Sequence, residues 1–435
     1  MPRNRPVSTG HVEQPTEQAT VSSTPLARVL VTSRLFAPEP AAASFRLRAV
    51  ANALDRSGAH VQVLTTKAPA ALAGNSDGTR SGVRVSRAPV LRDRDGYVRG
   101  YLQYLSFDLL LAFRMLFRKR PALVLTEPPP TTGAVVRVIC AIRRVPYAYY
   151  AADIWADAVG AVDTPGVVTR LVRWTELFAL RGAARVLSVS QGVTQRLAEL
   201  GISDTVRTIG NGIDIETFSS DGPRESLDGP VLLYAGTASE VHGAGIFLEA
   251  FEHVLAVRPE ARLVFLGQGS DRPAIEQAAE RFPGGTVRFF PRAEADSVAA
   301  WLRGAAASLA SVRPEQNYDF AFPTKLYASA AVGTPMIFTG VGPGAGFVRE
   351  SQGGWAVPYT VEAVATAMIA AVDQASADEH SVSRERLSDW ARKTIGLDGV
   401  ADRAVVALRE VARHTAPRDS KDPNPAPNNT EGRSR

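Results

Sequence analysis

Short apolar runs alternate along the chain with longer segments in which apolar residues recur every three or four positions. In the first half the runs occupy 27–32, 61–64, 83–88, 122–126, 147–152 and 186–189. Continuous runs rich in β-branched residues, separated by helical patterns, indicate parallel strands that are covered on both faces. Consecutive strand–helix–strand units predict a doubly wound, Rossmann-like domain.

The alternation stops at 209–218 and resumes after 221–230, a segment with the Gly, Pro and Asp content of a linker. Strands are then predicted at 231–234, 262–266, 287–290, 307–310 and 335–339, and helices at 243–257, 275–281, 297–303 and 325–332. We therefore predict an α/β fold of two Rossmann-like doubly wound parallel-sheet domains that face a cleft. Ligands are expected at the carboxyl ends of both sheets.

The length of 435 residues supports this division, because single cores stop growing near ~250–300 residues. Polar, Pro-rich composition predicts disordered tails at both ends. The predicted layout is a tail at 1–26, a first Rossmann-like domain at 27–210, a linker at 211–230, a second Rossmann-like domain at 231–385, helices at 386–414 that pack back toward the first domain, and a tail at 415–435.

Composition narrows the function classes. With 45% hydrophobic and 21% charged residues the chain is neither wholly disordered nor a coiled coil. Its single cysteine, Cys140, excludes an intramolecular disulfide framework and a cysteine-cluster zinc site. No apolar leader follows Met1, so we expect a cytoplasmic location, either free or peripheral on the inner face of the plasma membrane.

The net charge of +5 conceals a basic first half and an acidic second half. The basic half could face nucleic acid, an anionic membrane or a phosphorylated ligand, or could simply be solvated. No recognised nucleic-acid reading module is present, so we expect no nucleic-acid partner. The chain also lacks HExxH, GxSxG and GxxxxGK[ST] motifs, and it has no GxGxxG after the first strand. We expect no obligatory metal.

Loop signals at strand ends in the second half indicate an anion site. Gly236 and Thr237 follow one strand, and Gly267 to Gly269 follow the next. Thr324 is a candidate N-cap, and Lys325 lies in the first turn of the following helix. Backbone N–H groups, the helix dipole and one cation together suit a phosphate-bearing ligand. The alternative is ordinary turn glycines and a solvated lysine.

The segment 97–117 combines aromatic and aliphatic residues and is followed by basic residues. Tyr101 and Tyr104 lie among leucines that share one helical face, and Arg118, Lys119 and Arg120 follow the segment. Charged residues interrupt it, so it is too polar for a transmembrane span of ~20 apolar residues. It could be an amphipathic helix in the membrane interface or a core helix of the first domain.

Nine segments, taken in order and spacing, resemble one known family. They are 36–66, 104–113, 128–132, 153–159, 186–202, 209–218, 234–243, 265–276 and 322–338. The chain resembles GT-B glycosyltransferases of the retaining family-4 type, in the branch acting on envelope polysaccharides. The resemblance implies transfer from a nucleotide-diphosphate sugar, held by the second domain, to a lipid-linked glycan held by the first. With it, Tyr101, Tyr104, Arg118, Lys119 and Arg120 become candidates for the acceptor and the membrane surface. It implies no cofactor besides this donor.

The resemblance also assigns candidate residues to the donor. Gly236, Thr237, His242, Thr324 and Lys325 fall where the diphosphate is bound. Arg313 and Lys325 are the remaining cations there, because Thr237 and His242 stand where many members have Arg and Lys. The nucleotide base falls at the residues Gly267, Gly269, Phe290 and Arg292.

Two further positions concern the sugar and the acceptor. Ala328 stands where the family usually has a ribose-binding Glu, and Asp319 lies beside the position of its partner acid. The departure keeps a non-catalytic sugar-nucleotide binder as an alternative, with a GT-B epimerase as another. Asp153, after the strand at 147–152, is expected to orient the acceptor hydroxyl or the donor sugar. Its other interpretation is an N-cap before Ile154.

Overall fold

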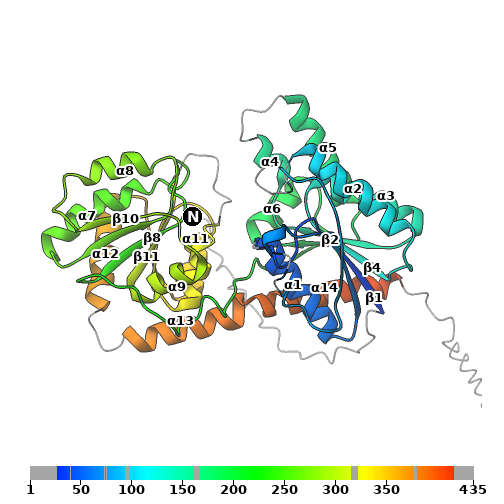
Figure 1. Ribbon diagram of the computed structural model, residues 1–435. Helices are drawn as coiled ribbons and strands as arrows, with labels where there is room; N and C mark the ends of the chain where they lie inside the picture. The colour runs from blue at the N-terminus through cyan, green and yellow to red at the C-terminus, as the bar shows by residue number, and fades with distance from the viewer. Residues whose placement is uncertain are drawn as a thin grey trace, which may run out of the picture.

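The computed structural model describes residues 27–39, 41–72, 74, 76–93, 98, 100–160, 166–314, 322–375 and 380–415. Two parallel sheets form separate lobes (Figure 1). The first has seven strands in the order β3-β2-β1-β4-β5-β6-β7, and the second has six in the order β10-β9-β8-β11-β12-β13. The strand order reverses between β1 and β4 and between β8 and β11, which are the places where doubly wound sheets bind ligands. The predicted fold class is confirmed.

The first lobe contains β1 (Arg28–Thr32), α1 (Ala42–Arg56), β2 (His60–Thr66), β3 (Arg84–Ala88), α2 (Tyr101–Leu116), β4 (Leu123–Thr126), α3 (Pro130–Arg143), β5 (Tyr147–Ala151), α4 (Trp155–Gly160), α5 (Gly166–Arg181), β6 (Arg185–Ser188), α6 (Gln191–Glu199) and β7 (Val206–Thr208). A 3-10 turn, Ala70–Leu72, lies between β2 and β3. Strand β7 is absent from the sequence prediction.

The second lobe contains β8 (Val231–Ala235), α7 (Gly245–Val257), β9 (Arg262–Leu266), α8 (Arg272–Ala279), β10 (Val287–Phe290), α9 (Ala295–Gly304), β11 (Ala305–Val312), α10 (Lys325–Val332), β12 (Met336–Gly340), α11 (Gly344–Ser351), β13 (Gly354–Val357) and α12 (Val361–Ala375). The chain ends in α13 (His380–Ile395) and α14 (Leu397–Thr415). Strand β13 is also absent from the prediction.

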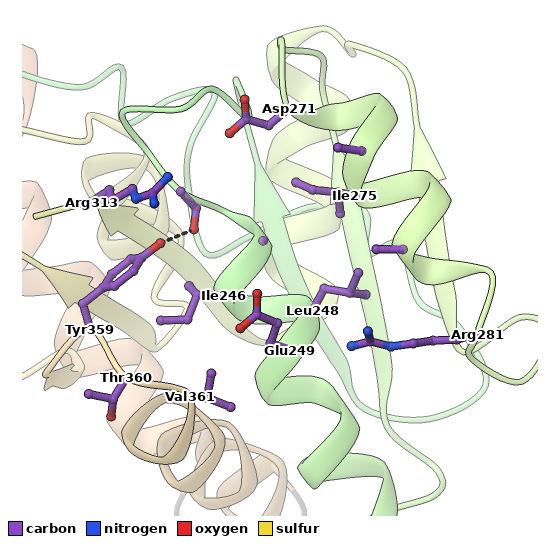
Figure 2. Close-up of a pocket in the computed structure, with 14 residues that line it drawn as sticks. Ile246, Leu248, Glu249, Asp271, Ile275, Arg281, Arg313, Tyr359, Thr360 and Val361 are labelled. Atoms are coloured by element: carbon purple, nitrogen blue, oxygen red, sulfur yellow. Dashed lines mark hydrogen bonds between the residues drawn. The ribbon is translucent and has the colours of Figure 1, made fainter. Parts of the chain in front are cut away.

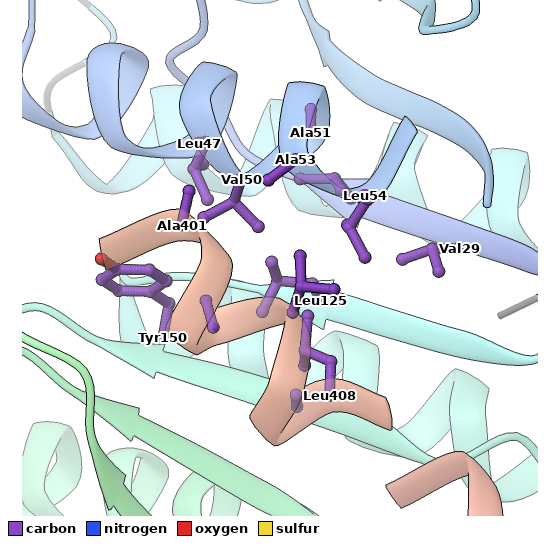
Figure 3. Close-up of a cluster of buried hydrophobic side chains, with 14 of the residues drawn as sticks. Val29, Leu47, Val50, Ala51, Ala53, Leu54, Leu125, Tyr150, Ala401 and Leu408 are labelled. Atoms are coloured by element: carbon purple, nitrogen blue, oxygen red, sulfur yellow. The ribbon is translucent and has the colours of Figure 1, made fainter. Parts of the chain in front are cut away.

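Helix α14 completes the core of the first lobe. Figure 3 shows Ala401 and Leu408 of α14 facing Val50 and Leu54 of α1, and all four are buried in one apolar cluster. Helix α13 packs instead against α10 of the second lobe. Of the helices predicted at 386–414, α14 therefore packs on the first lobe, whereas α13 belongs to the second.

The chain crosses between the lobes twice, and the two crossings are hydrogen-bonded to each other. The N–H of Ile213 donates to the carbonyl of Ile395 at 2.9 Å, and the N–H of Leu397 donates to the carbonyl of Ile213 at 3.0 Å. The predicted tails, 1–26 and nearly all of 415–435, lie outside the described residues, as does Asp319. Within the described chain, no helix is both long enough and apolar enough to cross a bilayer.

Candidate functional site

Two glycine loops lie backbone against backbone at the carboxyl edge of the second sheet. The N–H of Ala238 donates to the carbonyl of Gln268 at 2.8 Å. A Cβ built on Gly267 would lie 2.1 Å from the carbonyl oxygen of Gly236, and one on Gly269 would lie 1.8 Å from that of Ala238. Both glycines also have positive φ, of +143° and +149°. Only glycine fits such contacts, so the loops predicted for the diphosphate and the base lie side by side.

The amine of Lys325 lies beneath the first of these loops. Its Nζ is buried and has no hydrogen-bond partner among the described residues, although other parts of the residue reach the surface. The Nζ lies 3.4 Å from the ring centroid of Tyr234, and a Cβ on Gly236 would lie 3.3 Å from the Lys325 Cε. Burial lowers the pKa of this amine to about 7. An unpaired buried amine beside a glycine loop is suited to an anion.

Thr324 does not have the capping role predicted for it. Its backbone is helical, its side chain makes no capping hydrogen bond, and the residue is exposed. A capping residue needs an extended backbone so that its side-chain oxygen can reach the N–H groups of the first turn. Thr324 therefore lies at the predicted N-cap position without a side-chain cap, and it remains a candidate by its position before Lys325.

His242 is held toward its neutral form. Its Nδ1 lies 2.7 Å from the hydroxyl of Ser239. Burial, and secondly the nearby Lys325, hold the pKa of the ring below its ordinary value of 6.5. Thr237 is exposed, and its carbonyl accepts a hydrogen bond from the Tyr234 hydroxyl at 2.8 Å. The candidate cations of the loop are therefore Lys325 and Arg313.

A cavity of about 540 Å³ borders this loop, and Figure 2 shows its lining. Arg313 and Asp271 lie at one end, whereas Arg281 lies at the other. The hydroxyl of Tyr359 donates to the carbonyl of Gly243 at 2.7 Å across its wall. The lining includes neither the Lys325 amine nor the first glycine of the loop, so the cavity adjoins the predicted phosphate position without containing it.

The edge predicted for the base is held by an arginine that the sequence analysis did not identify. Arg272, in the first turn of α8, donates to the carbonyl of Phe290 at 2.6 Å and to that of Gly267. The Phe290 ring packs against Trp301 with centroids 4.9 Å apart, and Arg292 is exposed beside it. Arg272 thus joins the carboxyl ends of β9 and β10. Arg272 also pairs with Glu276, four residues later on α8. This spacing is a local sequence signal for a fixed arginine, but it does not indicate the contacts with the strand ends.

Asp153 follows β5, and its side chain is exposed at the edge of the first sheet. Among the described residues, it accepts one hydrogen bond, from the N–H of Ile154 at 2.9 Å. The N-terminus of α4 is capped by Glu176 of α5, whose carboxylate accepts the N–H groups of Trp155 and Ala156 at 2.8 Å each. Burial raises the pKa of Glu176 to about 7. The capping alternative for Asp153 is therefore wrong, which leaves its carboxylate available.

The switch point of the first sheet holds a buried carboxyl group that the sequence analysis also missed. Glu127, directly after β4, accepts a hydrogen bond from the hydroxyl of Ser33, directly after β1. Burial raises the pKa of Glu127 above its ordinary value. Arg46 of α1, which lies near it, donates to the side chain of Asn211 at 3.2 Å. The first sheet therefore presents polar groups where doubly wound folds bind ligands.

Helix α2 packs its inner side into the core and exposes apolar side chains on its outer side. Its inner side buries Phe107 and Met115, whereas Tyr101 is 73% exposed. The exposed apolar side chains of α2, α3 and α5, three helices that pack in series, form what we call the apolar face. They are Tyr101, Leu102, Leu105, Leu109, Phe113, Leu116, Phe117, Val138, Ile142, Val167, Leu171 and Trp174.

Tyr104 is not part of the apolar face. It turns inward, and its ring centroid lies 6.2 Å from that of Trp155. At the other end of α2, Arg118 donates to the hydroxyl of Ser86 at 2.9 Å, whereas Lys119 and Arg120 are exposed. The residues predicted for the acceptor side therefore lie at opposite ends of one helix.

Both halves of the chain match known glycosyltransferase families. Residues 229–374 match the family described as glycosyl transferases group 1, and residues 42–212 match the glycosyl transferase 4-like domain. The chain belongs to the GT-B glycosyltransferases of group 1.

One curated relative of this glycosyltransferase is a D-inositol 3-phosphate glycosyltransferase from Xylanimonas cellulosilytica, 27% identical over 157 residues. That match covers 32% of this chain and only 36% of the relative. Sucrose-phosphate synthase from Thermosynechococcus elongatus superposes with a TM-score of 0.64 at 18% identity, over 89% of this chain and all of that one. Anabaena HepE, in complex with UDP and glucose, gives 0.61 at 14% identity, over 88% and 100%. These structural likenesses show the shared fold.

Ala328, where the resemblance leads us to expect a ribose-binding Glu, lies in apolar surroundings. The residue is 8% exposed and belongs to an apolar cluster with Ala235 and Leu266, against which Phe290 packs. A carboxylate at this position would enter apolar surroundings. Within the described residues, no group of three or more His, Cys, Asp and Glu side chains could hold a metal. Metal-independent transfer remains a prediction.

Proposed function

We propose that this glycosyltransferase moves a sugar from a nucleotide-diphosphate sugar to a lipid-linked glycan, with retention of anomeric configuration. The reaction would serve the synthesis of a cell-envelope polysaccharide or glycolipid at the cytosolic face of the plasma membrane. The observation that carries the donor half is the buried, unpaired amine of Lys325 beside the glycine loop at Gly236. The complex of HepE with UDP and glucose supports a nucleotide-sugar donor.

The proposed chemistry depends on charge that develops on the leaving phosphate. The bond from the anomeric carbon to the phosphate oxygen breaks, and the acceptor oxygen bonds the same carbon on the same face. The acceptor proton passes to the leaving phosphate. Lys325 and Arg313 offset the phosphate charge, and removing one such fixed donor typically costs ~10²–10³ in rate. Asp153 orients the acceptor hydroxyl from the first domain.

The acceptor half of the proposal is supported by the apolar face. Monomeric soluble proteins rarely expose large contiguous apolar areas, and such areas often mark membrane or protein contacts. Here aromatic and aliphatic side chains on three adjacent helices are accompanied by Lys119 and Arg120, both exposed. Amphipathic surfaces with basic residues bind the interface of anionic membranes. We therefore propose an anionic membrane surface as a partner.

A binding and turnover experiment tests the proposal. The full chain is screened by thermal shift against UDP-, GDP- and dTDP-sugars, and the donor that stabilises it is then offered radiolabelled with membrane lipids. We expect stabilisation by one nucleotide class and transfer of label into the lipid fraction. No stabilisation by any sugar nucleotide would contradict the donor site.

A second candidate is a sugar-nucleotide-binding protein without catalysis. The observation that favours it is the apolar environment of Ala328, where the family usually has an acidic residue. This candidate predicts nucleotide binding with no transfer to any lipid acceptor and no release of free sugar. Turnover above that of a Lys325→Ala variant would exclude it.

A further inference from the structure

Arg34 is half-exposed, and its guanidinium lies against two aromatic rings. Its guanidinium carbon lies 4.4 Å from the ring centroid of Tyr104 and 5.7 Å from that of Trp155. The two rings meet nearly edge to face, at 74°. A guanidinium stacked on aromatic rings is held through its faces, so its N–H edges stay available for other partners.

The position of Arg34 is fixed at the carboxyl end of β1, beside the switch point of the first sheet. Its carbonyl accepts a hydrogen bond from the Thr66 hydroxyl at 2.8 Å, and its Nη1 donates to the carbonyl of Val98 at 2.7 Å. An arginine carries five N–H donors. Within the described chain this is the one hydrogen bond that the guanidinium donates, so most of its donors are available to a ligand.

Arg34 makes no hydrogen bond to a carboxylate within the described residues, although its charge acts on two buried acids nearby. The closest buried acids, Asp108 and Glu127, are occupied by the hydroxyls of Thr132 and Ser33. Burial raises the pKa of both carboxyl groups, and the nearby charge of Arg34 opposes that shift. In the part of the chain that the structure describes, Arg34 forms no ion pair. Within the described chain, the guanidinium therefore carries a positive charge that no salt bridge neutralises.

The first turns of α2 carry both the Tyr104 ring that Arg34 contacts and the first residues of the apolar face. Tyr104 lies in the first turn of α2. Tyr101, Leu102 and Leu105, in the first two turns, are exposed. Exposed leucine and phenylalanine side chains continue along the helix to Phe113. A positive group at the start of an apolar strip complements a ligand with an anionic head and a long apolar chain.

We propose that Arg34, with Tyr104 and Trp155, binds the phosphate of a lipid phosphate or diphosphate whose apolar chain lies along the exposed side of α2. The proposal rests on the proposed function and deepens it, because it assigns a place to the head of the lipid-linked acceptor. The donor loops of the second domain take no part in it.

Calorimetry with soluble probes tests this site on the full-length protein. Geranyl diphosphate carries both head and chain, geraniol the chain alone, and inorganic pyrophosphate the head alone. We expect the wild type to bind geranyl diphosphate more tightly than either fragment. Arg34→Gln should weaken geranyl diphosphate binding about tenfold or more, as expected for charged hydrogen bonds.

Arg137→Gln is the matched control. Arg137 is also stacked, 4.1 Å from the Phe178 ring centroid, and it too donates to a backbone carbonyl, but it lies on α3. The Arg137→Gln variant should bind geranyl diphosphate with the affinity of the wild type. Tyr104→Leu keeps the charge of Arg34 and removes a stacking ring, so it should weaken binding even if Arg34→Gln fails to fold.

Four outcomes overturn the proposal. They are no binding of geranyl diphosphate to the wild type, unchanged binding by Arg34→Gln, equal weakening by Arg137→Gln, and pyrophosphate binding as tight as that of geranyl diphosphate. The last would mean a site for free diphosphate. The nucleotide sugar is titrated into the same samples. Donor binding that survives in all variants leaves the proposed function standing, whereas its absence from the wild type contradicts that function separately.

Discussion

Lys325→Met separates the stability of the fold from the binding of the donor. Methionine keeps the length and apolar stem of lysine but removes the buried amine, which has no hydrogen-bond partner and lies 3.4 Å from the Tyr234 ring centroid. A buried polar group left unsatisfied costs about 1–3 kcal/mol. We therefore expect the free energy of unfolding to rise by about that amount at pH 7, while the affinity for the nucleotide sugar falls more than about tenfold.

The pH dependence of the stability difference follows from the pKa of the amine. Burial lowers that pKa from 10.5 to about 7, so between these values the unfolded chain binds more protons than the folded one. The stability of the wild type therefore rises with pH in this window, at up to about 1.4 kcal/mol per pH unit. The advantage of Lys325→Met should be greatest below pH 7 and should shrink as the pH approaches 10.5.

Urea unfolding at several pH values, together with calorimetry of the donor, measures both effects. Lys393→Met, an exposed lysine of α13, is the control and should change neither quantity. The reasoning is refuted if Lys325→Met destabilises the fold at pH 7 or binds the donor as tightly as the wild type. A stability difference that grows between pH 7 and 10.5 would also contradict it.

Three further predictions concern other parts of the molecule. Replacing Arg118, Lys119 and Arg120 with Ser should reduce co-sedimentation with anionic vesicles at low salt, at ~1 kcal/mol per basic residue near the surface; equal pelleting would exclude their role. Gly267→Ala should lower the unfolding midpoint, because its Cβ would lie 2.1 Å from a backbone oxygen of the neighbouring loop; a wild-type midpoint would mean that the loop shifts freely. Burial raises the pKa of Glu176 to about 7, so the wild type should lose stability relative to Glu176→Gln as the pH rises from 4.5 to 7; parallel stability curves in urea would contradict this.

The sheets were predictable because their central strands are continuous apolar runs. Helix α10 was predicted with the bounds that the structure shows, since Gly333 ends it in the left-handed conformation. The strands β7 and β13 were missed because each is short, lies at the edge of its sheet and is only partly buried. A short half-buried strand gives no continuous apolar run.

The site was less predictable because its key properties arise from distant segments. The place of Lys325 could be expected from the preceding Pro-Thr, but its burial depends on the ring of Tyr234 and the missing side chain of Gly236. The cap of α4 comes from Glu176 on the next helix. The aromatic corner around Arg34 joins three elements, and no local pattern marks such a convergence.

The configuration of the first product tests the central claim most directly. The full chain is incubated with the sugar nucleotide that stabilises it and with a lipid-linked acceptor, and proton NMR reads the new anomeric signal before any mutarotation. A donor with an α-linked sugar should give an α-linked product, as retention requires. A β-linked product would contradict the retaining mechanism, and the absence of any product despite donor binding would contradict the assignment as a transferase.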